Sequence, residues 1–145
     1  MTTVKNCLDQ KPNRIISVRP DDKVVTALEL MRDNRVRAVV VLDEERLAGI
    51  VTQGDCAIKV LLPGLDAKAT LIKDVMTANP MTVKLTDPLE ACMGLMVERT
   101  FRHLPVLEAG RLVGVVSIGD LVKDHIRYMS QQIGFLETYI KGHGA

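Results

Sequence analysis

Hydrophobic and polar positions follow the same order twice along the chain. Each time a short extended segment, at 15–18 and at 80–83, precedes a run with apolar residues at helical spacing. A β-rich segment, a polar turn and a second β-rich segment come next, which predicts hairpins over 37–52 and over 102–117. The second strand then runs into another helix at Asp55 and at Asp120. The pattern predicts an α+β fold with the order strand, helix, strand, strand, helix, present twice.

The two halves are also related residue by residue. Residues 18–55 align with residues 83–120 without a gap, at an offset of 65, with 13 identities in 38 positions. Unrelated segments of ordinary composition would share about two or three. Because apolar identities need only repeat a packing pattern, the repeated arginine, glycine and aspartate positions predict two equivalent polar sites. A weaker echo relates residues 4–8 to residues 72–76 at an offset of 68.

Helix starts and turns follow from local signals. Asp22 and Asp87 are expected to cap the amphipathic helices, with Pro88 at a first helical position that tolerates a missing N–H. Pro105 cannot donate to a β-ladder, so it is expected to face an edge or a gap. Residues 43–46 and 108–111 have the length and composition of hairpin turns, and residues 63–70 connect the halves.

A heptad-like stripe follows the second repeat. It predicts a helix that packs on the module or on a partner chain, and it consists of Val122, Ile126, Met129, Ile133, Leu136 and Ile140. The expected organisation is a single module over 1–145. Within it, a first repeat occupies 8–62, a second repeat occupies 72–128, and a C-terminal helix covers 129–141.

Composition narrows the function classes. Of the 145 residues, 47% are hydrophobic, which is ample for a packed core. With 19 basic and 18 acidic residues, no Trp and four other aromatic residues, the chain lacks the basic field and stacking platform of a nucleic-acid binder. Its three cysteines are isolated, which favours buried thiols in a reducing compartment. No apolar run is long enough to be a leader or a membrane span, so a soluble cytoplasmic protein is expected.

One local motif carries candidate chemistry in both repeats. Gly-x-x-hydroxyl-x-x-Asp occurs at 49–55 and at 114–120, with Thr52 and Asp55 in the first copy and Ser117 and Asp120 in the second. A hydroxyl followed three residues later by an acid resembles a helix capping box. The same geometry suits a phosphate at the helix start, with the aspartate accepting the two hydroxyls of a ribose. Both interpretations remain open from the residues alone.

Further candidates surround this motif. Arg37 and Arg102 precede the hairpins at equivalent positions, and arginine is the natural donor to phosphate oxygens, although a solvated charge at a strand end is an equal alternative. His103 follows Arg102, where the first repeat has Ala38, so the two sites differ chemically. The extended segments could hold a nucleobase through backbone groups and apolar side chains, and their residues are Ile16, Ser17, Val18, Met81, Thr82 and Val83.

At these residues the chain resembles a CBS-domain pair, also called a Bateman module. The resemblance spans nearly the whole chain and is closest to small stand-alone bacterial CBS-pair proteins. It depends on the two Gly-x-x-hydroxyl-x-x-Asp motifs, the duplication, Phe-Arg-His-Leu-Pro-Val at 101–106 and Val-Ser-Ile-Gly-Asp-Leu-Val-Lys at 116–123. It implies two tandem β-α-β-β-α repeats related by a pseudo-two-fold axis, with their sheets packed together, flanking helices and a C-terminal helix.

The resemblance also implies two clefts that bind adenosine-containing ligands such as AMP, ADP, ATP, NAD(H) or S-adenosylmethionine. Aspartates 55 and 120 would hold ribose, Thr52 and Ser117 would lie on the phosphate side, and Ser17 and Thr82 near the base. Arg37, Arg102 and His103 would face phosphate. Many relatives have Glu-Arg before the motif aspartate, where this chain has Gln53-Gly54. We therefore expect clefts of unequal affinity, with the second-repeat motif closer to the family pattern.

Two functions remain after these observations. The first is a regulatory module that senses an adenosine nucleotide and signals to a regulated protein, without catalysis, since no nucleophile with its base, paired carboxylates or metal cluster is found. The alternative is a structural or partner-binding dimer with vestigial, unoccupied clefts. In either case the apolar helix faces and the heptad-like stripe predict a homodimer.

Overall fold

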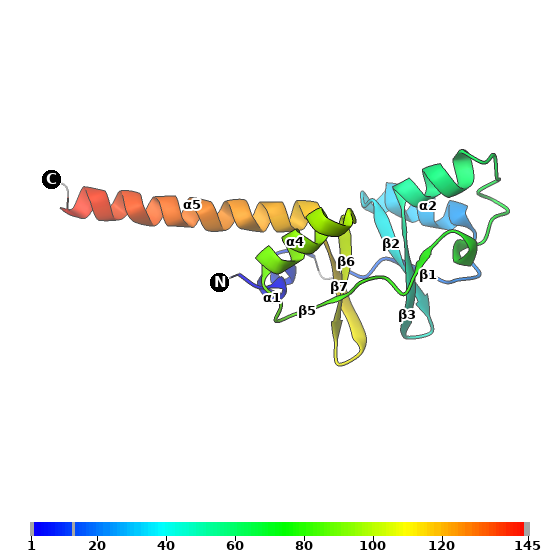
Figure 1. The fold of residues 1–145 in the computed structure, drawn as a ribbon, viewed down its shortest axis with the longest axis horizontal. Helices are drawn as coiled ribbons and strands as arrows, with labels where there is room; N and C mark the ends of the chain where they lie inside the picture. The colour runs from blue at the N-terminus through cyan, green and yellow to red at the C-terminus, as the bar shows by residue number, and fades with distance from the viewer. Residues whose placement is uncertain (1, 13, 144–145) are drawn as a thin grey trace.

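The computed structural model describes residues 2–12 and 14–143. Two units of similar build lie next to each other, each with a hairpin and covering helices, and the last helix extends far beyond them (Figure 1). This arrangement confirms the predicted α+β fold of two β-α-β-β-α repeats with a long C-terminal helix. None of the described helices has both the length and the apolar run that crossing a bilayer requires.

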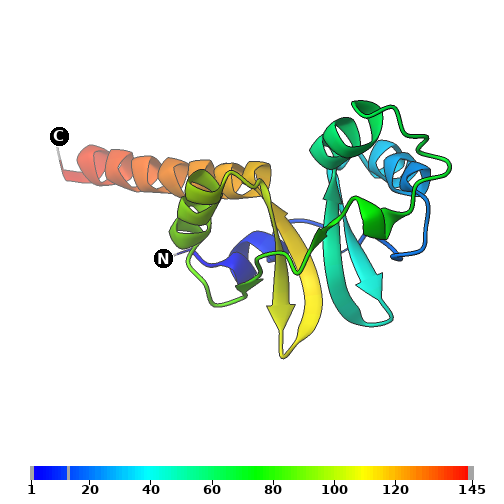
Figure 2. The same cartoon turned by 45° about the vertical axis from the view of Figure 1, so that its right-hand side comes forward.

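Each unit contains a small mixed sheet. The first sheet has the order β1 (Ser17–Val18), β2 (Ala38–Asp43), β3 (Arg46–Thr52) and β4 (Thr77–Ala78). The second has the order β5 (Val83–Lys84), β6 (His103–Glu108) and β7 (Arg111–Ser117). The outer strands β1 and β5 are parallel to their neighbours, and the hairpins β2–β3 and β6–β7 are antiparallel. The hairpins are neighbours, with β3 contacting β7 (Figure 2).

The helices cover these sheets at equivalent places. In the first unit these are α2 (Val24–Asn34) and α3 (Gln53–Cys56), which continues as a π-helical segment, η1 (Ala57–Leu61). In the second unit they are α4 (Leu89–Arg99) and α5 (Ile118–His143). Because α5 is continuous, the helix expected at 129–141 is the outer part of the second repeat's last helix. The predicted repeat limits of 8–62 and 72–128 stay a prediction.

Each hydrophobic core is completed by a segment from outside its own repeat. Helix α1 (Val4–Asp9) enters the core of the second unit through Val4 and Cys7. The short helix η2 (Ile72–Asp74), at the start of the second repeat, enters the core of the first unit, and β4 then pairs with β3. Backbone bonds are equivalent in the two places: Val4 N donates to Asp87 O over 2.9 Å, and Ile72 N donates to Asp22 O over 2.8 Å. The weak echo at an offset of 68 therefore marks two exchanged segments.

The expectation that Asp22 and Asp87 cap the amphipathic helices is wrong. Helix α2 begins after Lys23, helix α4 begins after Pro88, and neither N-cap residue makes a side-chain capping bond. Pro88 is therefore the N-cap rather than the first helical residue. The two carboxylates lie too early in the chain to reach the helix N–H groups. They accept instead from the N–H groups three residues upstream, at 2.8 Å in both repeats, and close the preceding turn.

Pro105 was expected to face an edge or a gap, and it lies in β6, the middle strand of its sheet, so the first of these two possibilities is wrong. Its nitrogen nevertheless faces a gap. In the first repeat the equivalent Val40 donates its N–H to the carbonyl of Ile16 over 3.2 Å. The corresponding carbonyl in the second repeat belongs to Met81, two residues before β5 begins. Proline is therefore accommodated without breaking the ladder of β5 and β6.

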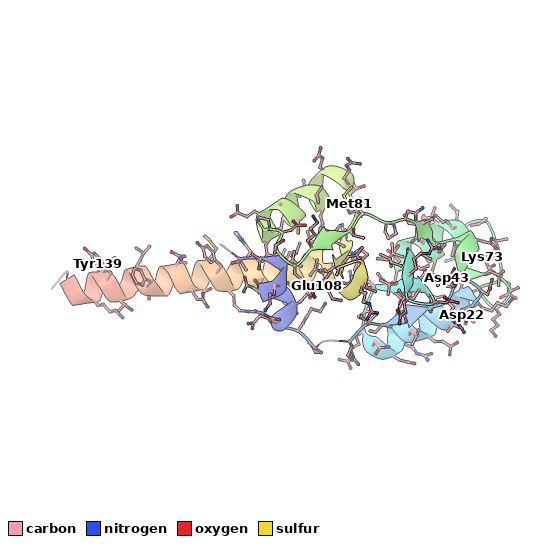
Figure 3. The ribbon with its side chains drawn as sticks, turned by 90° about the horizontal axis from the view of Figure 1, so that it is seen from below. Asp22, Asp43, Lys73, Met81, Glu108 and Tyr139 are labelled. Carbon is pink, nitrogen blue, oxygen red and sulfur yellow. The ribbon has the colours of Figure 1, made fainter. Side chains whose placement is uncertain are left out.

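The outer part of α5 carries exposed apolar side chains. It extends beyond both units, with Tyr139 near its far end (Figure 3). All residues of the heptad-like stripe are at least 40% exposed: Val122, Ile126, Met129, Ile133, Leu136 and Ile140. The stripe therefore does not pack on the module, which leaves a partner chain as the remaining prediction.

Candidate functional site

Two clefts of similar size lie between the units. Cleft A, about 570 Å³, contains Ser117 and Asp120 of the second repeat together with Ile16 of the first. Cleft B, about 560 Å³, contains Thr52 and Asp55 of the first repeat together with Met81 of the second. Both volumes are in the range of small-molecule sites. Because each cleft combines one repeat's motif with the other repeat's extended segment, neither cleft exists without both repeats.

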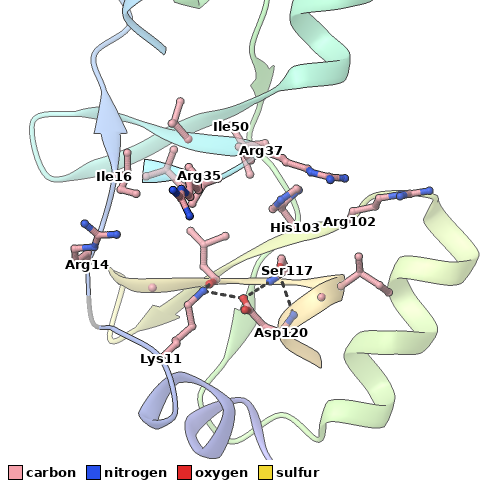
Figure 4. Close-up of a pocket in the computed structure, with 18 of the residues that line it drawn as sticks. Lys11, Arg14, Ile16, Arg35, Arg37, Ile50, Arg102, His103, Ser117 and Asp120 are labelled. Atoms are coloured by element: carbon pink, nitrogen blue, oxygen red, sulfur yellow. Dashed lines mark hydrogen bonds and ion pairs between the residues drawn. The ribbon is translucent and has the colours of Figure 1, made fainter. Parts of the chain in front are cut away.

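In cleft A the motif aspartate has a lysine partner (Figure 4). Lys11 Nζ donates to Asp120 Oδ2 over 2.7 Å and to the Val115 carbonyl over 3.0 Å. The same Oδ2 accepts from Ser117 N, and Asp120 N donates to Ser117 Oγ, at 2.9 and 3.1 Å. Burial raises the pKa of Asp120, but the bonds from Lys11 and Ser117 outweigh it, so this pKa lies below its usual value. Asp120 is therefore a stable carboxylate.

Cleft B repeats the capping box with a different cation. Thr52 N donates to Asp55 Oδ2 over 3.0 Å, and Asp55 N donates to Thr52 Oγ1 over 3.1 Å. Lys59, one turn along the helix, lies 3.2 Å from Asp55 Oδ1. Both carboxylate oxygens of Asp55 are thus engaged, whereas the contacts within the described residues engage only Oδ2 of Asp120. The second-repeat aspartate keeps an oxygen available for a ligand hydroxyl.

Arg37, Arg102 and His103 line both clefts. In Figure 4 the two arginines extend toward the same side of cleft A, and His103 lies between them and Asp120. Burial lowers the pKa of His103, and the positive charges of Lys11, Arg37 and Arg102 lower it further, against the opposing effect of Asp120. His103 is therefore neutral at pH 7 and presents an uncharged ring to the cleft.

The remaining predicted residues do not line either cleft. Val18 and Val83 are buried, 3% exposed each, in the cores of the two units. Ser17 is exposed on β1, and Thr82 is half-buried just before β5. Ile16 and Met81, directly upstream, are the members of the extended segments that reach the clefts. A ligand role for Ser17, Val18, Thr82 and Val83 stays a prediction.

Comparison with known proteins identifies the family. The CBS domain matches residues 11–61 and 72–125, which is more than half of the chain. The chain belongs to the CBS-domain family. This CBS-pair protein is 32% identical over 127 residues to the mitochondrial CBS domain-containing protein CBSX3 of Arabidopsis thaliana. The match covers 84% of this chain, which spans 62% of that relative's length.

Solved structures of other CBS proteins have the same fold. A CBS-domain protein of Burkholderia ambifaria, described as a candidate for signal transduction, superimposes with a TM-score of 0.85 and 43% identity over 87% of this chain and 95% of its own. CBSX2, whose structure was solved in complex with AMP, has a TM-score of 0.71 and 27% identity over 86% of this chain and 97% of its own. Stand-alone CBS-pair proteins are non-catalytic regulatory modules, which confirms the assignment of this chain as a non-enzyme.

Sequence reasoning missed four basic residues of cleft A: Lys11, Arg14, Arg35 and Lys123. Lys11 and Arg14 precede the aligned repeat and reach the second-repeat motif only through the chain's path between the units. Arg35 ends α2 in a left-handed conformation, with φ 54°. Glycine or asparagine normally takes this position. An arginine directly after the amphipathic run was therefore the sequence signal that could have marked Arg35 as a candidate.

The cysteines and acidic residues indicate no further chemistry. Burial, with smaller contributions from nearby aspartates, raises the pKa of Cys7 and of Cys92 to about 11, and burial also raises the pKa of Cys56. Within the described part of the chain, no three His, Cys, Asp or Glu side chains gather as a metal site would require. The cysteines act as small apolar core residues.

Proposed function

We propose that this CBS-pair protein is a regulatory module that senses an adenosine nucleotide or dinucleotide, namely AMP, ADP, ATP or NAD(H). The observation that carries the proposal is the pair of related clefts, each combining a hydroxyl–aspartate pair with arginines. An aspartate can accept both hydroxyls of a ribose, and arginine donates to phosphate. The AMP complex of the relative CBSX2 supports the ligand class.

Cleft geometry also suggests how binding becomes a signal. A ligand in either cleft contacts both repeats at once, because Asp120 and Ile16, or Asp55 and Met81, belong to different units. Binding would favour one packing angle between the hairpins over others, and a regulated protein would recognise that packing. A change in the packing between the two units is therefore sufficient to signal to a partner.

Ligand titration tests this function. AMP, ATP and NADH are each added to the full chain at millimolar concentration while the melting temperature is followed. At least one should raise it, since a ligand that binds only the native state stabilises it by mass action. In Asp120→Asn, which keeps an oxygen for the capping bond, the ligand-induced shift should fall while the melting temperature without ligand changes little. No shift with any of the three compounds would contradict the proposal.

The alternative function is a structural or partner-binding dimer with unoccupied clefts. Its supporting observation is that both motif aspartates already act in capping boxes. Under this alternative the unaltered protein binds no nucleotide. Asp120→Asn and Asp120→Ala would then change only the stability of the fold.

A homodimer is proposed for either function, because the apolar stripe of α5 needs a cover. A chain ending at Tyr128 should then be monomeric by light scattering. If that shortened chain stays dimeric, the part of α5 beyond Tyr128 lies outside the interface. A cytoplasmic location is also part of the proposal, and the named relative in Arabidopsis thaliana is mitochondrial.

A further inference from the structure

The two clefts differ strongly in charge. Cleft A is lined by one acidic residue, Asp120, and by six basic ones, Lys11, Arg14, Arg35, Arg37, Arg102 and Lys123. Cleft B is lined by one acidic residue, Asp55, and by two basic ones, Arg37 and Arg102. Their formal charges are therefore +5 and +1, in a chain whose net charge is +1. Basic residues are concentrated in one of two otherwise similar clefts.

The difference arises at equivalent positions of the repeat. At the offset of 65, Arg14, Arg35 and Lys123 of cleft A correspond to Asn79, Thr100 and Ile58. Asn79 and Thr100 line cleft B at the places that the arginines occupy in cleft A. The motif itself is the same in both. Charge, rather than backbone shape, therefore separates the two clefts.

Most of the basic side chains in cleft A lack an acidic partner. Lys11 is paired with Asp120, but the salt bridges among the described residues include none to Arg14, Arg35, Arg37, Arg102 or Lys123. In Figure 4 Arg14 and Arg35 lie on one side of the cleft, and Arg37 and Arg102 extend toward the other. Like charges gathered in a concave site repel one another and attract an anion.

Arg35 also occupies a backbone position that disfavours it. Its φ of 54° is in the left-handed region, where a non-glycine residue is strained. Glycine or asparagine at this helix end would relieve that strain. The equivalent Thr100 of cleft B has the same left-handed backbone, with φ 60°, so the two clefts differ here only in the side chain that the shared backbone carries.

We infer that cleft A takes a ligand with two or more phosphates, such as ATP, ADP or a dinucleotide, and that cleft B takes a ligand with a single phosphate, such as AMP. This inference rests on the proposed function and adds a division of labour between the clefts. A di- or triphosphate brings about two to four negative charges, which the +5 cleft neutralises and the +1 cleft does not. A monophosphate needs only the arginines that both clefts share.

Exchange of residues between the clefts tests the inference. The double variant Arg14→Asn/Arg35→Asn gives cleft A neutral residues, and asparagine tolerates the left-handed backbone at position 35. Calorimetric titration with ATP and with AMP should show a loss of about tenfold in ATP affinity, because two exposed charge contacts are removed, and at most a twofold loss for AMP. The converse variant Asn79→Arg/Thr100→Arg should strengthen ATP binding at the weaker site.

A matched control removes the same charge elsewhere. Lys84 and Arg99 are exposed, line neither cleft and have no salt bridge among the described residues. Lys84→Gln/Arg99→Gln should therefore leave both affinities within about twofold, since distant exposed charges are screened. Added salt should weaken ATP binding more than AMP binding in the unaltered protein.

The outcomes separate this inference from the proposed function. If Arg14→Asn/Arg35→Asn weakens ATP and AMP equally, or no more than the control variant does, the charge-based division is wrong while nucleotide sensing stands. If neither ATP nor AMP binds the unaltered protein, the division fails, and if NADH does not bind either, the proposed function fails with it. A selective loss of ATP affinity, reversed in sign by the converse variant, supports both.

Discussion

Lys11 Nζ lies 2.7 Å from Asp120 Oδ2, and this ion pair ties the segment after α1 to the first turn of α5. The two residues are 109 positions apart. The pair is more enclosed than the lysine pair within α1, with Lys11 34% and Asp120 22% exposed against 64% and 57% for Lys5 and Asp9. It links the N-terminal segment to the motif of cleft A and to α5, the helix that extends beyond the two units.

Loss of this link should weaken the fold. Lys11→Ala removes the partner of a half-buried carboxylate, so the free energy of unfolding should fall by about 1 kcal/mol, an amount reduced by the solvent that reaches the lysine. Urea denaturation at neutral pH measures it. Lys5→Ala breaks the exposed pair with Asp9 and should cost about half that or less. Equal losses in the two variants would mean that the Lys11 pair has no special role.

The two repeat-equivalent glycines Gly49 and Gly114 should respond differently to a methyl group. A Cβ at Gly49 would lie 2.7 Å from both Met76 Sδ and the Thr77 carbonyl, and that carbonyl belongs to the backbone of the paired strand β4. A Cβ at Gly114 would lie 2.9 Å from the flexible end of Leu8. Urea denaturation should show a loss of about 3 kcal/mol for Gly49→Ala and about 1 kcal/mol for Gly114→Ala. The reverse order would refute the packing argument.

His103 should make the fold less stable in mild acid. Its pKa in the folded protein is below the value of 6.5 expected for the unfolded chain. The unfolded state therefore binds more protons as the pH falls below about 6.5, and stability declines until the pH reaches the folded-state pKa. His103→Ala, which copies Ala38 of the first repeat, should lose less stability between pH 7.5 and pH 5 than the unaltered protein. If urea denaturation shows that the variant and the unaltered protein lose the same free energy of unfolding between these two pH values, His103 is not the cause.

The cysteines should be inert in the native state. With a pKa of about 11 for Cys7 and for Cys92, only about one thiol in a thousand is ionised at pH 8. All three side chains are also at most 7% exposed. A disulfide reagent such as Ellman's should therefore react slowly with the native protein and at once with all three thiols in urea. Rapid reaction of one thiol without denaturant would reveal local opening around that residue.

The sequence was sufficient for the features that repeat within each half. The offset of 65 located both hairpins and both motifs, because local patterning and turn residues determine them. The missed features depend on where distant segments meet. Nothing near Val4 indicates that it packs beside Leu104 of the second core, and nothing near Arg14 indicates that it lines a cleft with Ser117. The caps expected at Asp22 and Asp87 failed because a carboxylate before a helix can equally close the turn upstream.

The exchange of α1 and η2 between the two cores has a consequence for a chain with one repeat. Such a chain would carry a leading segment with no place in its own core, and a core that lacks such a segment. It could complete its core only by exchanging leading segments with a second copy. The duplicated chain keeps both copies at a high effective concentration, so the exchange takes place within one molecule. Fusing the two repeats thus turns an association that depends on protein concentration into an ordinary step of folding.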